Sequence, residues 1–313
     1  MPDPKAGPGE VLVRVHASGI NPADVKRRAG WLGTGMDHPR VIPHADGSGV
    51  IEAVGDGVDP GRVGERVWLW NAQGGYGTAG RAFGTAAEMI ALPSAQVVPL
   101  PDTLTFAEGA CLGVPAMTAY LAVFGDGDIA GKSVLIQGAG GAVGIFATQF
   151  AVLGGAHVIA VAGHKGRAEL ARQAGAETIL SRDAEDLADQ IFGITGPDGI
   201  DRIIEVDFGA NLPVTSEVLA NAGIVASYSS STEPEPTLPY YAFAARGASV
   251  RFVQGFRVPE DIRKAGEAHI AELASSGQLK IPIGLCLPLD RIAEAHEAVE
   301  TGQVVGQTVL ELQ

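Results

Sequence analysis

Several residue types are scarce in this sequence, and each shortage narrows the classes of protein that it can encode. Only two of its 313 residues are cysteines, so the chain lacks the thiols for a disulfide framework or a four-cysteine zinc site. We expect both, Cys111 and Cys286, to be reduced residues of the core. Basic residues are outnumbered as well: 22 Lys and Arg against 36 Asp and Glu give a net charge of −14. That charge argues against general binding to nucleic acid or to anionic membranes, which requires a basic surface.

The sequence also lacks an uninterrupted hydrophobic run that could span a bilayer. Residues 133–163 contain no charged side chain, but seven glycines divide them, and Gln137, Gln149 and His157 would lie in hydrocarbon. A parallel strand that is buried on both faces explains such an apolar stretch more simply. The first residues lack the apolar core of a signal peptide. We therefore expect a soluble protein in the cytoplasm.

Glycine, by contrast, is abundant, with 43 residues. The most informative cluster, Gly138–Gly144, follows the apolar run Val134–Ile136 and precedes a helical pattern at 142–154 and a second apolar strand at 157–162. A strand, a tight glycine turn and a helix bring backbone N–H groups and the positive end of the helix dipole to a diphosphate. The strict motif would need a third glycine at Val143, so an ordinary glycine-rich turn is the alternative. The flanking strands favour a dinucleotide-binding site, and its candidate glycines are Gly138, Gly140 and Gly141.

The end of the second strand indicates which dinucleotide is bound. Sites that prefer NAD usually place Asp or Glu there to bind the ribose hydroxyls. This chain has Gly163, His164, Lys165 and Arg167 instead, with space at the glycine and basic groups after it. A 2′-phosphate, which carries almost two negative charges, would favour that environment. The sequence therefore favours NADPH; alternatively, Lys165 and Arg167 are solvated residues in the first turn of the next helix.

The order of strand-like and helix-like segments predicts an α/β fold with two domains. The first third of the chain consists of short strand-like runs separated by turn clusters. Residues 122–256 alternate strands and helices, which is typical of a Rossmann-type doubly wound parallel sheet. We expect this nucleotide-binding domain to be inserted into a β-rich domain formed by 1–121 and 257–313. The predicted helices span 142–154, 166–174, 184–193, 213–220, 260–276 and 289–301.

Five segments that span almost the whole chain carry a family pattern in the expected order. They are Gly19–Asp24, Gly49–Gly55, Gly113–Tyr120, Gly138–Gly144 and Ala293–His296. With them the chain resembles the medium-chain dehydrogenase/reductase superfamily, and specifically its zinc-free, zeta-crystallin-like quinone oxidoreductase group. Two further segments are similar to that group, Ile203–Glu205 and Ala210–Leu212. The resemblance implies that the β-rich part is a GroES-like catalytic domain.

The chain lacks residues that zinc-dependent members of this superfamily use as metal ligands. Zinc-dependent relatives have a cysteine where this chain has Asn21, and a Gly-His-Glu triplet where it has His44-Ala45-Asp46. Because a catalytic zinc needs about three protein ligands, the resemblance implies an enzyme without a metal and a structural or solvent-facing role for His44. Without a metal, hydride transfer from NADPH to a conjugated acceptor, either a quinone or an α,β-unsaturated carbonyl, is the easier reaction.

The same resemblance implies roles for individual residues. Asn21 should lie near the reacting carbon and hydrogen-bond either the substrate or the nicotinamide, and Thr118 should lie beside the nicotinamide. Trp31 is a candidate aromatic wall for a planar acceptor, with ordinary surface packing as the alternative. The other implied cofactor contacts lie on the glycine turn and at the carboxyl ends of late strands, where such sheets bind ligands: Gly141, Ala142, Val143, Tyr228 and Gln254.

Three features depart from the family pattern. Ser181 stands where a tyrosine near the adenosine phosphate is frequent, and Gln307 replaces a familiar lysine. We keep Ser181 as a candidate cofactor contact, but binding of a 2′-phosphate then depends mainly on Lys165 and Arg167. The chain also begins late relative to the pattern, so we expect one strand of the β-rich domain to have an exposed edge.

Three functions remain open on this basis. The first is an NADPH-dependent quinone reductase, and the second is an enone or enoyl reductase that uses the same pocket for another acceptor. The third is a non-catalytic NADPH-binding protein, either a sensor or a structural protein. By analogy, the strand-like segment 248–254 should pair across a two-fold axis and form a homodimer. The expected partners are therefore a small quinone or enone and a second copy of the chain.

Overall fold

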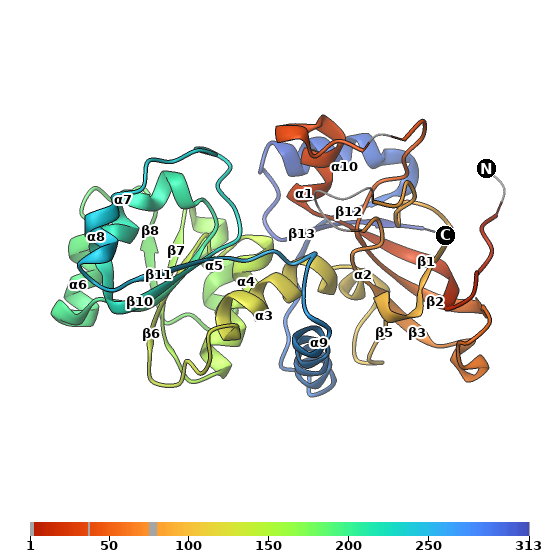
Figure 1. Cartoon of the computed structure of the whole chain (residues 1–313), viewed down its shortest axis with the longest axis horizontal. Coiled ribbons are helices and arrows are strands. Elements are labelled where there is room, and N and C mark those ends of the chain that lie inside the picture. The colour runs from red at the N-terminus through yellow and green to blue at the C-terminus, as the bar shows by residue number, and fades with distance from the viewer. Residues whose placement is uncertain (1–2, 37, 75–79, 313) are drawn as a thin grey trace. The chain divides into compact units, whose positions relative to one another are not determined.

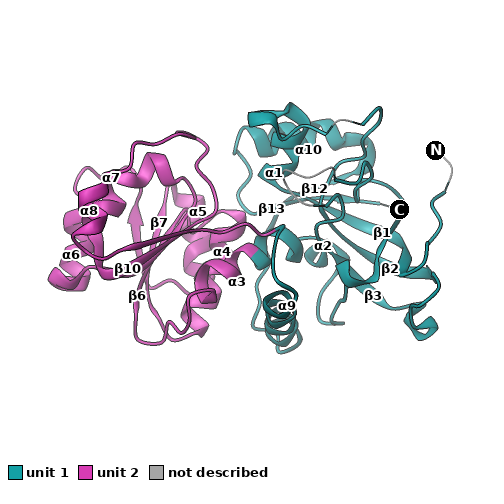
Figure 2. Cartoon of the chain, in the orientation of Figure 1, with its two compact units in different colours: residues 1–117, 256–313 teal, residues 118–255 magenta. Residues whose placement is uncertain are grey.

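The computed structural model describes residues 3–36, 38–74 and 80–312, and its chain divides into two compact units (Figure 2). Unit 1 comprises residues 1–117 and 256–313, and unit 2 comprises residues 118–255. The boundaries expected from the sequence, 121/122 and 256/257, lie close to these divisions. Each unit has its own sheet and its own core.

Unit 2 contains a six-stranded sheet in the order β11-β10-β9-β6-β7-β8, and all its strand pairs are parallel. The strands are β6 (Ser133–Gln137), β7 (His157–Ala162), β8 (Thr178–Ser181), β9 (Ile200–Glu205), β10 (Leu219–Ser227) and β11 (Ser249–Phe252). The helices are α3 (Met117–Phe124), α4 (Ala142–Leu153), α5 (Lys165–Gln173), α6 (Leu187–Thr195), α7 (Phe208–Val218) and α8 (Tyr240–Ala244). Helices connect the successive strands (Figure 1), and the strand order reverses between β6 and β9. The expected α/β class with a Rossmann-type doubly wound sheet is confirmed.

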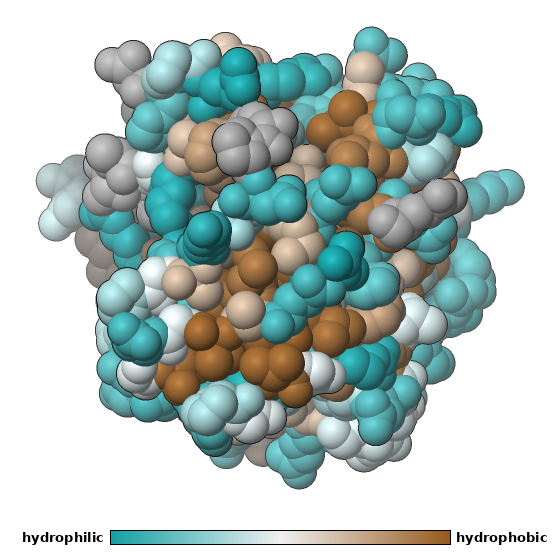
Figure 3. Space-filling model, turned by 90° about the vertical axis from the view of Figure 1, so that its right-hand side faces the viewer, coloured by the Kyte–Doolittle hydropathy of each residue, from teal (hydrophilic) through white to brown (hydrophobic). Residues whose placement is uncertain are grey.

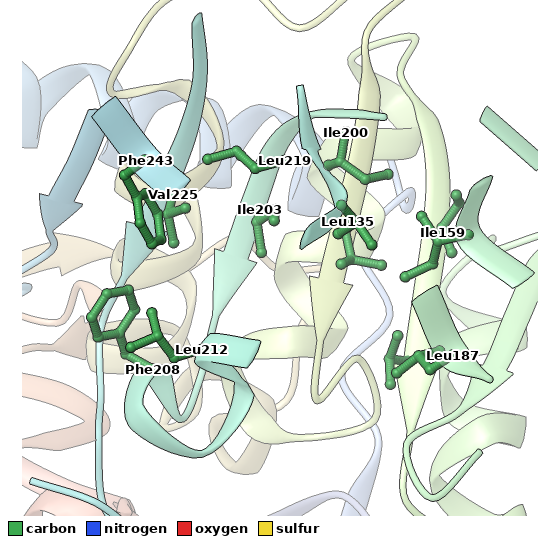
Figure 4. Close-up of a cluster of buried hydrophobic side chains, with 13 residues drawn as sticks. Leu135, Ile159, Leu187, Ile200, Ile203, Phe208, Leu212, Leu219, Val225 and Phe243 are labelled. Atoms are coloured by element: carbon green, nitrogen blue, oxygen red, sulfur yellow. The ribbon is translucent and has the colours of Figure 1, made fainter. Parts of the chain in front are cut away.

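The core of unit 2 explains why its strands read as continuous apolar runs. Leu135, Ile203 and Val225, from three adjacent strands, are completely buried. Figure 4 shows them in one cluster with Phe208 and Leu212 of α7 and other apolar side chains. Because helices cover the sheet, the strands have little need for polar residues.

The predicted start of α7, at residue 213, is wrong. The helix begins at Phe208 and contains Pro213 in its interior. Proline lacks the N–H that an interior helix position uses, so it is more common in the first turn of a helix than at this position. Gly209 lies in the first turn of α7, and a Cβ there would lie 2.5 Å from the backbone carbonyl oxygen of Glu233.

Unit 1 contains a seven-stranded sheet in the order β12-β13-β1-β2-β3-β5, with β4 paired to β1. The strands are β1 (Glu10–Ile20), β2 (Asp46–Val54), β3 (Arg66–Leu69), β4 (Met89–Pro93), β5 (Val97–Pro99), β12 (Ile283–Pro288) and β13 (Gln307–Glu311). The helices are α1 (Pro22–Ala29), α2 (Phe106–Gly109), α9 (Glu260–Ser275) and α10 (Ile292–Glu300), and a π-helical turn spans Leu112–Ala116. Strand β1 pairs with β2 on one side and with β4 and β13 on the other. Strands β4, β5 and β12 each pair with a single strand among the described residues, so the edges of this sheet lie there.

The two cysteines of unit 1 differ in their environments. Cys111 is buried as expected, but Cys286 is exposed, so its assignment to the core is wrong. Cys286 lies on β12 at the edge of the sheet, and the next residue, Leu287, is the buried one. Burial alternates along a strand, and Cys286 occupies the outward position.

The surface of unit 1 combines polar and apolar residues. A space-filling view from the side of this unit shows a hydrophobic patch surrounded by hydrophilic residues (Figure 3). The exposed large hydrophobic residues of unit 1 are Leu32, Val41, Val63, Phe83 and Ile262. Among the described residues, no helix has the length and apolar character needed to cross a membrane.

Candidate active site

The glycine turn of unit 2 connects β6 to α4 and depends on residues without a Cβ. Gly138 has a φ of +70°, which glycine adopts without strain, and its carbonyl accepts a hydrogen bond from Gly141 N at 2.9 Å. A Cβ on Gly144 would lie 2.1 Å from Gly138 O, and a Cβ on Gly140 would lie 2.3 Å from Arg167 O. Gly141 is the N-cap residue of α4 and has no side chain that could cover the helix N-terminus. The turn therefore fits a diphosphate that approaches the backbone closely.

The predicted phosphate-binding residues meet where β7 and β8 end side by side. Ala162 is in register with Ser181, so Gly163 and Ser181 lie at the same sheet edge. His164 is the N-cap residue of α5, and its Nδ1 accepts a hydrogen bond from Arg167 N at 3.4 Å. Lys165, the first residue of α5, is exposed, and Arg167 is half-buried. The structure thus brings together all five residues that the sequence suggested for this end of the cofactor.

Arg182 is a further basic residue at this edge that the sequence reading missed. A Cβ on Gly163 would lie 3.1 Å from the Cζ atom of Arg182, so the guanidinium group lies over the glycine. Burial, followed by the positive charge of Arg182, lowers the pKa of Arg167. Asp183 pairs with Arg182 at 3.0 Å, with both side chains more than 60 % exposed. Arg182 thus lies near a position at which an NAD site would have a carboxylate, and its charge acts on Arg167.

The position of Arg182 at this site can be predicted from the sequence. The residue directly follows Ser181, and Ser181 ends the strand that neighbours β7. The carboxyl ends of parallel strands meet at one edge of a sheet. A basic residue at the end of either strand therefore belongs to the same site.

Three other predicted cofactor residues also lie in unit 2. Tyr228 follows β10 and its backbone N–H donates to Glu205 O at 3.1 Å. Gln254 follows the adjacent strand β11 and is exposed. Thr118 in α3 is buried and packs against Gly255, where a Cβ would lie 2.7 Å from Thr118 Oγ1.

Glu205 organises the connection from β9 to α7 and was not singled out as a site residue. Its side chain is completely buried. It accepts hydrogen bonds from Asp207 N at 2.7 Å, from Asn211 Nδ2 at 2.7 Å and from Thr215 Oγ1 at 3.2 Å. The pair Glu205 and Asn211 therefore explains why the two family-like segments 203–205 and 210–212 occur together.

In unit 1, Asn21 lies in a cluster of buried polar side chains. It is the N-cap residue of α1, and its Nδ2 donates to Asp46 Oδ2 at 2.7 Å. The same oxygen accepts a hydrogen bond from Val114 N at 2.8 Å. Asp24 accepts from the backbone N–H groups of Asn21, at 2.8 Å, and of Ala45, at 3.1 Å. Both the backbone and the side chain of Asn21 are thus held in place.

The two carboxyl groups of this cluster are forced towards their neutral forms. Burial, followed by the charge of Asp24, raises the pKa of Asp46 to about 8. Burial also raises the pKa of Asp24 to about 6. At neutral pH Asp46 is therefore largely a neutral carboxylic acid.

His44 is completely buried, so the expected solvent-facing alternative is wrong and the structural one remains. Its Nδ1 lies 2.8 Å from Ser18 Oγ, and its Nε2 lies 2.8 Å from Nε2 of His296. His296 belongs to α10 and is 2 % exposed. No local pattern predicts this contact, because the two residues are 252 positions apart.

The donor atoms near Asn21 do not fit a zinc ion. Both ring nitrogens of His44 are engaged in hydrogen bonds, Asn21 supplies an amide, and Asp46 Oδ2 already accepts two hydrogen bonds. Three negatively charged or imidazole ligands at this point would require these contacts to break. Within the described parts of the chain, no group of three or more His, Cys, Asp or Glu residues is arranged to hold a metal.

The predicted aromatic wall, Trp31, lies in a short 3₁₀ turn after α1. The ammonium group of Lys26 lies 4.5 Å from the centre of its ring, and Thr34 Oγ1 donates to its carbonyl at 2.6 Å. These contacts are those of a partly exposed surface residue, and they do not connect Trp31 to the Asn21 cluster.

Unit 1 also has a depression of about 630 Å³ that the sequence did not suggest. It is lined by Trp70, Asn71, Gln96, Phe256, Arg263 and neighbouring residues. Asn71 has a left-handed backbone conformation, with a φ of +50°, and is 8 % exposed. Gln96 Nε2 donates to the carbonyl of Asn71 at 2.5 Å, which fixes this wall of the depression.

Comparison with known proteins identifies two sequence families that match different regions of this chain. A sequence family described as "Alcohol dehydrogenase GroES-like domain" matches residues 7–102, and one described as "Zinc-binding dehydrogenase" matches residues 142–271. The quinone oxidoreductase of Homo sapiens is 32 % identical over 308 residues, which cover 96 % of this chain and 88 % of the human protein.

Solved structures agree with these matches. A crystal structure of an NAD-dependent alcohol dehydrogenase is similar with a TM-score of 0.89 and 29 % identity, and covers 100 % of this chain and 94 % of that one. The 2-octenoyl-CoA carboxylase reductase in complex with NADP and 2-octenoyl-CoA is similar with a TM-score of 0.84 and 26 % identity, over 99 % of this chain and 80 % of that one. The chain is thus an oxidoreductase that binds a nicotinamide cofactor, and it belongs to the quinone oxidoreductase group of the medium-chain dehydrogenase/reductase superfamily.

Proposed function

We propose that this protein is a zinc-independent oxidoreductase that uses NADPH to deliver hydride to a quinone. The observation that carries the choice of cofactor is the pair of arginines, Arg167 and Arg182, beside Gly163 at the end of β7. The quinone is supported by the similarity to the human quinone oxidoreductase. Independence from zinc is supported by the hydrogen bonds that already occupy Asn21, His44 and Asp46.

The residues of unit 2 fit the parts of NADPH. The glycine turn, Gly138 to Gly144, would take the diphosphate on the N-terminus of α4. The 2′-phosphate would be bound near Gly163 by the guanidinium groups of Arg167 and Arg182, with Lys165 and Ser181 at the same sheet edge. When bound, the reduced nicotinamide supplies the hydride.

The residues of unit 1 would orient the reactants. The amide of Asn21 is fixed by Asp46 and would hydrogen-bond either the acceptor or the carboxamide of the cofactor. Hydrogen bonds to a conjugated carbonyl oxygen stabilise the negative charge that develops there during hydride transfer. Thr118 in α3 is proposed as a contact of the nicotinamide.

An oxidation assay tests the proposal. We expect NADPH, followed through the absorbance of its reduced nicotinamide, to be oxidised in the presence of ortho- or para-quinones, and faster than NADH at equal concentration. Treatment with a zinc chelator should leave the rate unchanged. Oxidation that needs added zinc would contradict the zinc-independent mechanism, and faster oxidation of NADH would contradict the choice of cofactor.

A second candidate is reduction of a conjugated carbon–carbon double bond. It is favoured by the structural similarity to the reductase that was solved with NADP and 2-octenoyl-CoA. The same assay with enones and enoyl thioesters separates the two acceptors. If NADPH binds but no acceptor accelerates its oxidation, the protein is a non-catalytic NADPH-binding protein. A cytoplasmic location is part of the first proposal and can be tested by cell fractionation.

We also propose that the protein forms a homodimer through β11. This strand ends the sheet of unit 2, and unpaired edge strands are templates for pairing with another chain. Phe252, its last residue, is 73 % exposed, and Tyr241 in α8 is 84 % exposed. Sedimentation should therefore show a species of twice the 32.1 kDa chain mass.

Phe252→Glu should convert that species into the monomer, because a charge in an apolar contact is poorly solvated. Ile194→Glu is the matched control, since Ile194 lies in α6 and is 48 % exposed. A wild-type protein that sediments as a monomer would refute the dimer.

A further inference from the structure

His44 has a backbone conformation that residues other than glycine rarely adopt. Its φ is +81°, a left-handed conformation that is strained for a residue with a Cβ. The imidazole ring is completely buried, so water does not solvate its nitrogens. Contacts inside unit 1 must therefore offset the cost of this conformation.

Hydrogen bonds at both ring nitrogens hold His44 in place. Nδ1 lies 2.8 Å from Ser18 Oγ on β1, and Nε2 lies 2.8 Å from Nε2 of His296 on α10. The two ring centroids lie 5.0 Å apart and the ring planes are inclined by 24°, so the rings lie end to end and nearly in one plane, as an in-plane hydrogen bond requires. Because His44 lies just before β2, this contact connects α10 to the beginning of that strand.

The hydrogen bonds around His44 can run in only one direction. Thr85 Oγ1 donates to the backbone carbonyl of Asp46 at 2.5 Å, so it must accept from the hydroxyl of Ser18, 2.8 Å away. Ser18 Oγ then accepts from Nδ1–H of His44. The Nε2 lone pair of His44 in turn accepts from Nε2–H of His296.

This direction requires a neutral His44, and its surroundings favour that form. Burial, followed by the neighbouring His296, lowers the pKa of His44 to about 3. His296 Nδ1 is buried and has no hydrogen-bond partner among the described residues, as expected for a neutral ring that donates through Nε2. Burial, followed by Arg28, lowers the pKa of His296.

The series of hydrogen bonds from His296 ends at Asp46, and Asp46 orients the side chain of Asn21. Asp46 Oδ2 accepts from Val114 N, which can only donate. The amide nitrogen of Asn21 donates to the same oxygen at 2.7 Å. The amide of Asn21 thus has one defined orientation, with its nitrogen committed to Asp46.

We propose that His44 and His296 are positioning residues that, through Ser18 and Thr85, hold Asp46 where its carboxyl group fixes the amide of Asn21. The proposal rests on the proposed function, in which Asn21 contacts the acceptor or the nicotinamide. The hydrogen bonds reach the backbone carbonyl of Asp46 and not its carboxyl group. The two histidines therefore act through geometry and transfer no proton to the site.

The first test is His44→Gly, which removes the ring and suits the left-handed backbone. We expect kcat for quinone-dependent NADPH oxidation to fall about tenfold, because small displacements of positioning groups are costly. The KM for NADPH should change less than about threefold, since most cofactor contacts lie in unit 2. Ala222→Gly is the matched control: Ala222 also has a positive φ, +56°, is exposed and lies in β10. It should leave kcat unchanged.

Variants of His296 keep the test decisive if His44→Gly does not fold. Gln in place of His296 can still donate an N–H to His44 Nε2, whereas Leu cannot. We expect His296→Gln to retain kcat within about threefold and His296→Leu to lose about tenfold. Full kcat in both His44→Gly and His296→Leu would overturn the proposal.

Two NMR signatures are independent of turnover. Long-range ¹H–¹⁵N spectra should show the Nδ1–H tautomer for His44 and the Nε2–H tautomer for His296. The side-chain amide signals of Asn21 should shift or broaden in His44→Gly but not in Ala222→Gly. The opposite tautomer at His44, or unchanged Asn21 signals, would overturn the proposal. A wild-type protein without acceptor-dependent NADPH oxidation would contradict the proposed function instead.

Discussion

Replacing Arg167 and Arg182 together by alanine is expected to raise the Kd for NADPH about a hundredfold and to leave the Kd for NADH within about twofold. The guanidinium group of Arg182 lies beside Gly163 and its charge acts on Arg167, and each of the two arginines would form a charge-assisted hydrogen bond with the 2′-phosphate. At a partly exposed site one such bond is worth about 1.4 kcal/mol, which corresponds to a factor of about ten in affinity. Titration of both cofactors by calorimetry measures the two constants.

The two single variants separate the contributions of the arginines. Arg182→Ala and Arg167→Ala should each weaken NADPH binding about tenfold. Arg172→Ala serves as the control, because Arg172 also lies on α5 but pairs with Glu169 at 2.5 Å, with 62 % of its side chain exposed. An equal loss of NADPH and NADH affinity in the double variant would show that the arginines support the fold and do not recognise the phosphate.

Asp46→Asn should make the free energy of unfolding less dependent on pH between about 4 and 8. The folded protein raises the pKa of Asp46 from 3.8 to about 8, through burial first and then Asp24. Below pH 4 the carboxyl group is protonated in both states. As the pH rises from 4 to 8, only the unfolded state releases the proton, so the folded protein loses stability relative to it. The asparagine has no such proton, and its amide oxygen can still accept from Asn21 and Val114.

The advantage of the variant should grow with pH and level off above 8. Four pKa units correspond to an upper bound of roughly 5 kcal/mol. Urea denaturation of both proteins at pH 5 and pH 8 measures the difference. Asp102→Asn is the control, because 97 % of the Asp102 side chain is exposed. Stability curves of wild type and Asp46→Asn that stay parallel over this range would contradict the buried neutral carboxyl group.

The fold could be predicted where local sequence determines local structure. The predicted bounds of β6, β7 and α4 agree with the structure to within one residue, because uninterrupted apolar strands and a glycine turn are unambiguous local signals. Strand β12 was missed because the prolines and glycine around it suggested an irregular crossing. Strand β12 is stabilised by its backbone pairing with β13, and its own residues carry no clear strand pattern.

The candidate site could be predicted only in part. The glycine turn and the residues after β7 are each a short continuous segment that follows a strand. A local strand–turn–helix pattern therefore predicts each of them. The contact of Asn21 with Asp46 spans 25 positions and that of His44 with His296 spans 252. Such pairs follow from tertiary packing, which no periodicity in the sequence expresses. The family resemblance predicted Ser181 as a cofactor contact, but it did not predict Arg182, the next residue.

The packing of Gly140 on Arg167 limits how the choice of cofactor can be redesigned. A Cβ on Gly140 would lie 2.3 Å from the backbone carbonyl of Arg167 and 2.5 Å from its Cβ. The wall of the diphosphate site and the backbone of the phosphate-binding segment therefore form a single closely packed block. Grafting a whole loop from an NADH-dependent homologue would disturb both at once. Conversion to NADH, by evolution or by engineering, is accessible through side-chain changes at positions 163, 165 and 182 that leave this block intact.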